Sequence, residues 1–127
     1  MKIDVDRQVA YWRKGAEEDW EVGADLVATR KTRHGLFFIH LAIEKLLKAH
    51  VCCVTKDVAP KIHSLSRLAE LSGLPFSREQ LGFLLVLNRF CLAGRYPRTR
   101  ETPPSAARAQ AFVKEAEGLK TWLTDQL

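Results

Sequence analysis

The feature of the sequence that most limits its fold is a strongly apolar stretch between Gly35 and Val54. Apolar residues occupy most of the circumference that this stretch would have as a helix, which is typical of the middle of a bundle. Glu44, Lys45 and Lys48 interrupt the stretch, so no apolar run reaches the roughly 18 residues that a membrane span requires. Glu44 and Lys48 stand one helical turn apart, in the order that favours an ion pair. The stretch therefore predicts the central helix of an all-α protein that is not associated with a membrane.

Four further segments repeat apolar residues at helical spacing on either side of this stretch. Asp4 or Asp6 can cap the first of them, Ser77 and Gln80 form the pattern of a capping box, and Ser105 can cap the last. No segment has the signal of a strand, and 127 residues suffice for one core but not for two. We therefore predict one domain over residues 1–127, an up-and-down bundle of four main helices plus a short one, with helices at about 6–29, 35–54, 63–71, 78–93 and from 106 onward.

Two of the expected connections are rich in basic residues. Arg30–Gly35 is a short basic link in which glycine is expected to break the helical pattern, and Gly94–Pro104 is expected to be a loop because its prolines exclude regular structure. A guanidinium group matches the oxygens of a phosphate, and the net charge of +5 permits a nucleic acid or an acidic protein as partner. The alternative is a loop that is simply solvated. The candidate residues for nucleotide or RNA binding are Arg89, Arg95, Arg98 and Arg100.

Polar residues within the apolar pattern have two interpretations each. Asp19 interrupts the stripe of the first helix, either at the rim of the core or as a carboxylate that ties two helices together. Cys52, Cys53 and Cys91 are an odd number, and two of them are neighbours that point about 100° apart on a helix, so they predict small buried apolar groups and neither a disulfide framework nor a metal site. We expect no metal and no cofactor.

Four fragments of the sequence occur in an order that resembles a known family. Ala16-x-x-Asp19 precedes Phe38-x-x-x-Ala-Ile-Glu-Lys-x-x-Lys-Ala49, His63-Ser-Leu65 opens the short helix, and Arg95-Tyr-Pro97 follows the fourth helix. Together they resemble the HEPN family of small helical domains, over nearly the whole chain. The resemblance implies a helical bundle that commonly forms a homodimer. It also implies a cognate minimal nucleotidyltransferase as partner, in pairs several of which act as toxin and antitoxin.

Some members of that family are metal-independent ribonucleases. Their motif is an arginine, four to six residues and a histidine, with a tyrosine two positions further in one subset. Arginine stabilises charge on the scissile phosphate, and histidine moves protons near neutral pH. The matching stretch here has Arg89 and Tyr96 in place, but Gly94 occupies the histidine position and cannot move a proton. This departure argues against an enzyme.

Tyr96 has a second interpretation from the same resemblance. In the nuclease subset, the partner nucleotidyltransferase modifies the tyrosine of the motif with adenylate groups, which makes Tyr96 a possible modification acceptor. The alternative is that Tyr96 packs on the bundle where Pro97 prevents the helix from continuing.

Histidines elsewhere in the chain provide alternatives to the missing one. Arg33 and His40 have the spacing of the motif but stand at the wrong place in the fold, so His40 is expected to be a core or rim residue. His63 is expected to cap the short helix or to fix it through a hydrogen bond, and a catalytic role is its alternative. The catalytic candidates are accordingly Arg89, Arg95 and His63.

Three functions remain open at this point: a dimerising module that binds a nucleotidyltransferase, a nucleotide or RNA; a ribonuclease with a non-standard composite site at the dimer interface; and an interaction protein without a ligand. Gly94 argues against the second, and the basic loop argues against the third. The N-terminal segment contains Asp4 and Asp6 and lacks an apolar core, so we expect no signal peptide and a cytoplasmic location.

Overall fold

The computed structural model describes residues 3–95 and 104–127, with the side chains of these ranges except those of residues 91–95. Its elements are α1 (Val5–Ala28), α2 (Thr32–Thr55), α3 (Leu65–Ser72), α4 (Arg78–Arg95) and α5 (Ala106–Asp125). All regular structure in the described ranges is helical, which confirms the predicted all-α class.

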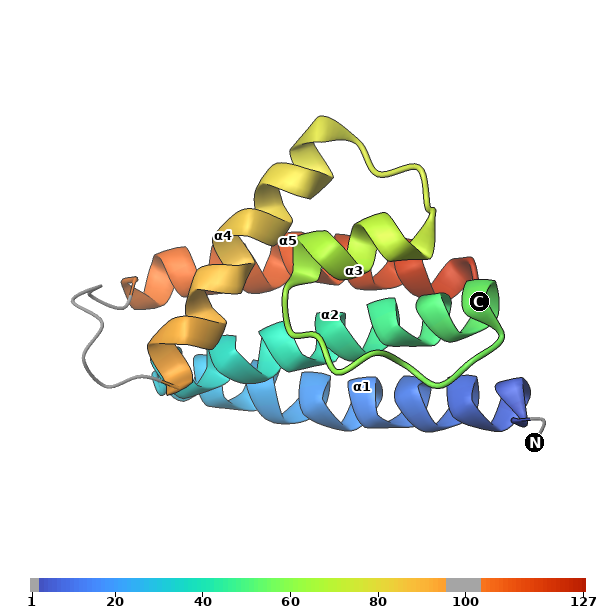
Figure 1. The fold of residues 1–127 in the computed structure, drawn as a ribbon. Coiled ribbons are helices and arrows are strands. Elements are labelled where there is room, and N and C mark those ends of the chain that lie inside the picture. The colour runs from blue at the N-terminus through green and yellow to red at the C-terminus, as the bar shows by residue number, and fades with distance from the viewer. Residues whose placement is uncertain (1–2, 96–103) are drawn as a thin grey trace.

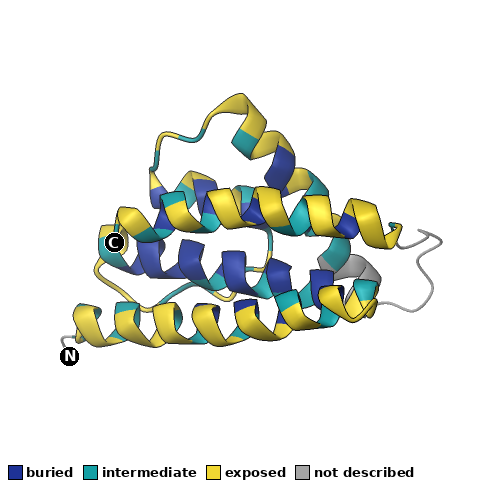
Figure 2. Ribbon diagram, turned by 180° about the vertical axis from the view of Figure 1, so that it is seen from behind, coloured by how far each residue is buried: buried dark blue, intermediate teal, exposed yellow. Residues whose placement is uncertain are grey.

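The helix α2 lies at the centre of the bundle. It packs against each of the other four helices, with its largest interface against α1. Figure 1 shows α1, α2 and α5 running along the same axis, with α4 crossing them obliquely and the short α3 beside it. Figure 2 shows that α2 is largely buried, whereas the outer faces of α1 and α5 are exposed. The apolar stretch was therefore correctly predicted as the middle of the bundle.

One large apolar cluster forms the core, and every helix contributes to it. Ile39, Ile43 and Leu47 of α2 are completely buried, at successive steps of four along one face. Full burial of one such side chain stabilises the fold by about 1.5–3 kcal/mol. The largest side chains that meet them from the other helices are Trp20, Leu65, Leu68, Phe83, Leu84, Leu87, Leu119 and Leu123.

Side-chain caps hold four helix starts, three of them at predicted positions, while α3 is capped by Ser64 and not by His63. Asp4 accepts a hydrogen bond from the backbone N–H of Arg7, and Ser64 and Ser105 accept equivalent bonds at α3 and α5. The capping box at α4 has both of its bonds: the backbone N–H of Gln80 donates to Ser77 Oγ at 3.1 Å, and the backbone N–H of Ser77 donates to Gln80 Oε1 at 2.8 Å. These bonds satisfy backbone donors that have no partner within the helix.

Three predicted boundaries were wrong. The short helix α3 begins at Leu65 and not at His63. The helix α2 begins at Thr32, so Gly35 lies inside its first turns and does not break the helix. Glycine is required there by the neighbouring helix, because a Cβ on Gly35 would lie 2.8 Å from the backbone nitrogen of Val27. The helix α4 extends to Arg95, so Gly94 and Arg95 belong to its last turn and not to the loop predicted from Gly94 onward. A single glycine costs an otherwise favourable helix only about 1 kcal/mol.

Among the described residues, no helix is both long and apolar enough to cross a membrane.

Candidate functional site

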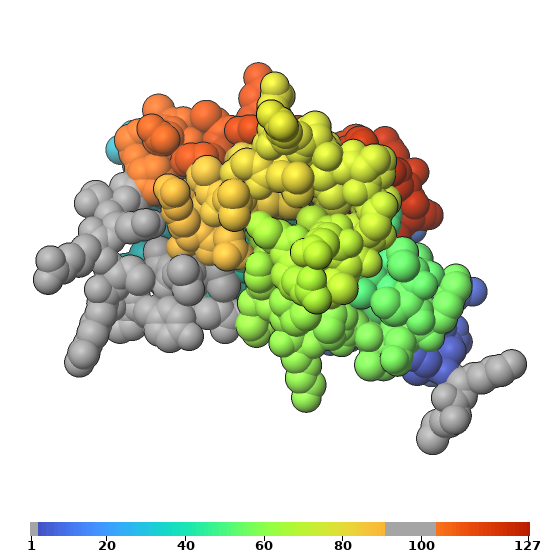
Figure 3. All heavy atoms as spheres, turned by 45° about the horizontal axis from the view of Figure 1, so that its top comes forward, coloured from blue at the N-terminus to red at the C-terminus, as the bar shows by residue number. Residues whose placement is uncertain are grey.

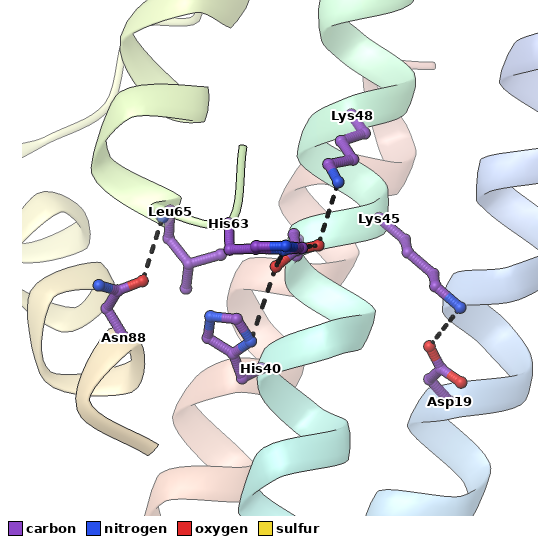
Figure 4. A network of polar contacts seen from close by, with 8 residues as sticks. Asp19, His40, Lys45, Lys48, His63, Leu65 and Asn88 are labelled. Carbon is purple, nitrogen blue, oxygen red and sulfur yellow. Dashed lines mark hydrogen bonds and ion pairs between the residues drawn. The ribbon is translucent and has the colours of Figure 1, made fainter. Parts of the chain in front are cut away.

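A buried carboxylate, that of Glu44 on α2, is the centre of a polar cluster. Its side chain is only 4% exposed, and Lys48 Nζ lies 3.2 Å from Oε2, which confirms the predicted ion pair. Nδ1 of the buried His40 lies 4.0 Å from Oε1. Figure 4 shows Lys48, His40 and His63 arranged around this carboxylate. Removing a carboxylate from water costs several kcal/mol, which its cationic and N–H neighbours offset.

His63 reaches the same carboxylate from the segment before α3. Its Nδ1 lies 3.3 Å from both oxygens of Glu44. Because an ionised carboxylate only accepts hydrogen bonds, Nδ1 carries the proton and donates it. The histidine side chain is 56% exposed, so the ring joins a buried carboxylate to solvent. The prediction that His63 fixes the short helix through a hydrogen bond is confirmed.

Asn88 connects this region to α4. Its Oδ1 accepts a hydrogen bond of 3.2 Å from the backbone N–H of Leu65, the first residue of α3. Asn88 could not be predicted from the sequence, because an asparagine within a helix gives no signal of a partner on another element. Asn88 precedes Arg89 directly, so the contact places the start of α3, with His63 two residues before Leu65, against the part of α4 that carries the predicted arginine.

A second ion pair joins α1 to α2 beside the cluster. Lys45 Nζ lies 2.7 Å from Asp19 Oδ2, with side chains 28% and 16% exposed. Asp19 therefore does both things that its position allowed: it lies near the rim of the core and ties two helices together. Lys48 makes a further contact between α2 and α1, since its Nζ lies 5.2 Å from the ring centroid of Trp12.

His40 is completely buried within α2, as expected for a core residue. Arg33, its partner in the chance match to the nuclease motif, is exposed near the start of the same helix. Within the described ranges, no three histidine, cysteine, aspartate or glutamate side chains are grouped so as to hold a metal ion.

His50 makes a further polar contact that the sequence did not indicate. Its Nε2 donates to the backbone carbonyl of Leu123 at 2.8 Å, which connects α2 to α5. Burial lowers the pKa of His50, the hydrogen bond to Leu123 opposes this shift, and the charge of Arg13 adds to the lowering. Burial therefore favours the neutral imidazole, whose hydrogen bond to Leu123 has a structural role.

The two described cysteines occupy different environments at the end of α2. Cys52 is completely buried, and Cys53 is half-buried. Burial raises the pKa of the Cys52 thiol, and the nearby Cys53 and Asp57 raise it further. Cys52 confirms the prediction of a small buried group, whereas the side chain of Cys91 lies outside the described part.

The predicted phosphate-binding residues belong to the last turns of α4 and the segment after it. Arg89 is exposed and makes no ion pair with a described residue, and Arg95 is the last residue of α4. The surface of α4 lies between α3 and α5 (Figure 3). Tyr96, Arg98 and Arg100 lie outside the described residues.

Comparison with known proteins agrees with this architecture. The model of the HEPN domain family matches residues 9–126. The crystal structure of TT1696 from Thermus thermophilus has a similar fold, with a TM-score of 0.77 and 17% sequence identity over 94% of this chain and 98% of that one. No curated protein sequence gives a significant match to the chain. Because the family model covers almost the whole sequence, the chain belongs to the HEPN domain family.

Proposed function

We propose that this HEPN protein is a dimerising binding module that holds a nucleotide or an RNA at the C-terminal end of α4 and works with a minimal nucleotidyltransferase, within a toxin–antitoxin-type pair. The observation that carries the proposal is the free guanidinium of Arg89. It is exposed on α4 and unpaired among described side chains, six residues before the arginine that ends the helix. Arg98 and Arg100 follow within five residues in the sequence. Four arginines in one region suit a phosphate ligand, because each guanidinium group matches the oxygens of a phosphate.

The dimer and the nucleotidyltransferase rest on membership of the family. Two copies of a HEPN domain commonly pair, and the motif region at the end of the fourth helix is where both protomers contribute to one site. A homodimer would double the number of arginines that face a ligand there. Tyr96, in the same region of the sequence, remains the proposed acceptor of adenylate groups from the partner enzyme.

Binding is preferred to cleavage because Gly94 lacks the side chain that the family's nuclease motif requires. Gly94 lies in the last turn of α4. Without a proton-transferring group, arginines can still hold a phosphate but cannot activate the ribose hydroxyl.

A metal-independent ribonuclease is the second candidate, and one observation favours it. The Nδ1 of His63 is fixed against the Glu44 carboxylate, while the ring remains 56% exposed. A carboxylate that accepts a hydrogen bond from a histidine and orients its ring is the arrangement of a general acid–base pair. In a composite site at a dimer interface, His63 would take the place of the histidine that Gly94 replaces, with Arg89 or Arg95 contacting the phosphate.

The binding proposal is tested with labelled RNA and ATP as separate probes, without metal. We expect Arg89→Ala combined with Arg95→Ala to weaken binding about 10-fold or more, since hydrogen bonds to a charged group contribute roughly 1.5–3 kcal/mol. The matched control is Arg78→Ala, an exposed arginine at the other end of α4. Unchanged affinity in the double variant would refute the binding site.

RNA cleavage in the same samples distinguishes the two candidate functions. RNA cleavage by the wild type that His63→Ala abolishes would establish the ribonuclease, and intact RNA supports the binding module. A solution mass of twice 14.4 kDa tests the dimer. Co-purification with a minimal nucleotidyltransferase encoded beside this chain, followed by a search for adenylate on Tyr96 by mass spectrometry, tests the partner.

A further inference from the structure

Four helix ends meet at one end of the bundle around a small apolar cluster. Val27 of α1, Leu36 of α2 and Ala109 of α5 are buried together there, and Phe90 of α4 and Phe112 of α5 pack against them. The rings of Phe90 and Phe112 are in edge-to-face contact, with centroids 5.3 Å apart. Figure 1 shows the α1–α2 turn, the end of α4 and the start of α5 at this same end. The turn and the proposed site on α4 therefore belong to one surface.

The charge of this surface is strongly one-sided. Its described segments, residues 24–36, 86–95 and 104–112, contain six lysine and arginine residues and one acidic residue, Asp25. We call the exposed cations with described side chains the basic end; they are Arg30, Lys31, Arg33, Arg89 and Arg108.

Among the described residues, the cations of the basic end have no acidic partner, unlike the lysines that lie between helices. No ion pair joins any of the five to another described residue, whereas Lys45, Lys48 and Lys120 are each paired with a carboxylate. Five cations without an acidic partner in the described ranges give this end a positive potential that a polyanion would neutralise.

The α1–α2 turn presents its cations on a rigid support. Arg30 adopts a left-handed backbone conformation with φ of 64°, and the backbone N–H of Lys31 donates to the carbonyl of Leu26 at 2.8 Å. Immediately behind the turn, α1 and α2 cross so closely that no Cβ fits at Gly35. A backbone that is already held in place loses less conformational entropy when its side chains bind a ligand, which favours a specific contact over diffuse attraction.

We infer that the α1–α2 turn is a second phosphate-contact surface, so that the sugar–phosphate backbone of a nucleic-acid strand runs across the basic end from α4 to Arg30, Lys31 and Arg33. This inference rests on the proposed function and specifies its ligand as a strand. The helix α2 packs against both α4 and α1, and neighbouring helix axes lie about 8–10 Å apart. The two groups of cations therefore stand on different elements of one end of the bundle, where successive phosphates of a strand can contact both.

The test measures binding of a fluorescent 12-nucleotide oligouridine by anisotropy, with oligodeoxythymidine of equal length as a second probe. The variant combines Arg30→Ala, Lys31→Ala and Arg33→Ala. Its matched control combines Arg7→Ala, Lys14→Ala and Lys114→Ala, which removes three exposed charges that lie outside the basic end and form no ion pair with a described residue. Circular dichroism checks that both triple variants are folded, and Lys31→Ala with Arg33→Ala replaces the first variant if substitution of Arg30 disturbs the turn.

We expect the turn variant to bind both oligouridine and oligodeoxythymidine at least 10-fold more weakly at low salt. Both should be affected because the proposed contacts are to phosphates, which the two strands share. Each phosphate contact contributes about 0.7 to the slope of log K against log salt for a single strand, so this slope should fall by roughly 2. The control variant should change affinity less than twofold. The strand that the wild type prefers identifies whether the natural source is RNA or DNA.

Three outcomes would overturn the inference, and they differ from failure of the proposed function. If Arg89→Ala with Arg95→Ala weakens binding but the turn variant does not, the turn is no contact surface while the α4 site stands. If ATP and the strands lose affinity equally in the turn variant, the ligand is a mononucleotide. If polyglutamate competes as well as oligouridine, the surface attracts any polyanion. Absence of all nucleotide and strand binding in the wild type would instead refute the proposed function itself.

Discussion

Gly23 of α1 and Gly35 of α2 face each other where the two helices cross. A Cβ added to Gly35 would lie 2.9 Å from the carbonyl oxygen of Gly23 and 2.5 Å from Cγ2 of Val27, distances at which something must move. Two of the nearest atoms belong to the backbone of α1, so a side-chain rotation cannot make room. The pair sets how closely the longest two helices approach.

We predict that Gly35→Ala lowers the free energy of unfolding by about 1–3 kcal/mol, because the extra methyl group forces α1 and α2 apart. The control is Gly118→Ala on α5, where a Cβ would meet no atom within 4 Å. Alanine there should stabilise the helix by up to about 1 kcal/mol. Urea denaturation of both variants measures the difference, and equal effects at the two positions would contradict the role of the crossing.

The Glu44 cluster predicts a large cost for losing its carboxylate. In Glu44→Gln, the buried His40 and Lys48 lose their negative partner, which should destabilise the protein by about 3–5 kcal/mol. Glu70→Gln removes one partner of an exposed pair with Arg67 and should cost at most about 1 kcal/mol. Thermal unfolding of the two variants measures both. If the two variants have similar melting temperatures, burial of Lys48 and His40 does not require the negative charge of Glu44.

The lowered pKa of His50 predicts a pH dependence of stability. Burial is the main cause, so the unfolded chain binds a proton at this residue more readily than the folded chain does. Stability should therefore fall as the pH drops through about 6.5, the ordinary histidine value, and be unaffected well above it. The slope below pH 6.5 should flatten in His50→Gln and persist in His34→Gln, which alters an exposed histidine. If the slope of stability against pH is unchanged in His50→Gln, another residue causes the pH dependence.

The cysteines at the end of α2 predict unequal labelling. Only the thiolate reacts with iodoacetamide, and burial raises the pKa of the Cys52 thiol while it also blocks access. Cys53 should therefore be alkylated much faster than Cys52 at pH 8, as followed by peptide mass spectrometry of the native protein. In guanidinium the two rates should converge. Faster labelling of Cys52 in the native protein would place it nearer the surface than the structure does.

Much of the fold could be predicted because it depends on residues that are close together in the sequence. The caps at Asp4, Ser77 and Ser105 and the apolar face of α2 depend on residues three or four positions apart, which the sequence displays directly. The role of Gly35 could not be predicted from local patterns. Its role depends on a helix that is distant along the chain, so local propensity suggested a break where tertiary packing requires a glycine inside the helix.

The candidate site was predictable only in part, for the same physical reason. The pair of Glu44 and Lys48 is one helical turn apart and was expected, whereas the contacts of Glu44 with His63 and of Leu65 with Asn88 join elements about 20 residues apart. The basic residues of the α1–α2 turn were noticed as a link, but only the packing around Val27 and Phe112 brings them to the end of α4.

The long hairpin of α1 and α2 also has a consequence for the order in which the chain folds. The two helices form the largest interface of the bundle, and only Thr29, Arg30 and Lys31 separate them in sequence. Closing so short a connection costs little chain entropy, and contacts between sequence neighbours form fast. We expect the hairpin to assemble while α4 and α5 are still being synthesised, so that the ribosome releases a chain whose first half already provides the template on which the second half docks.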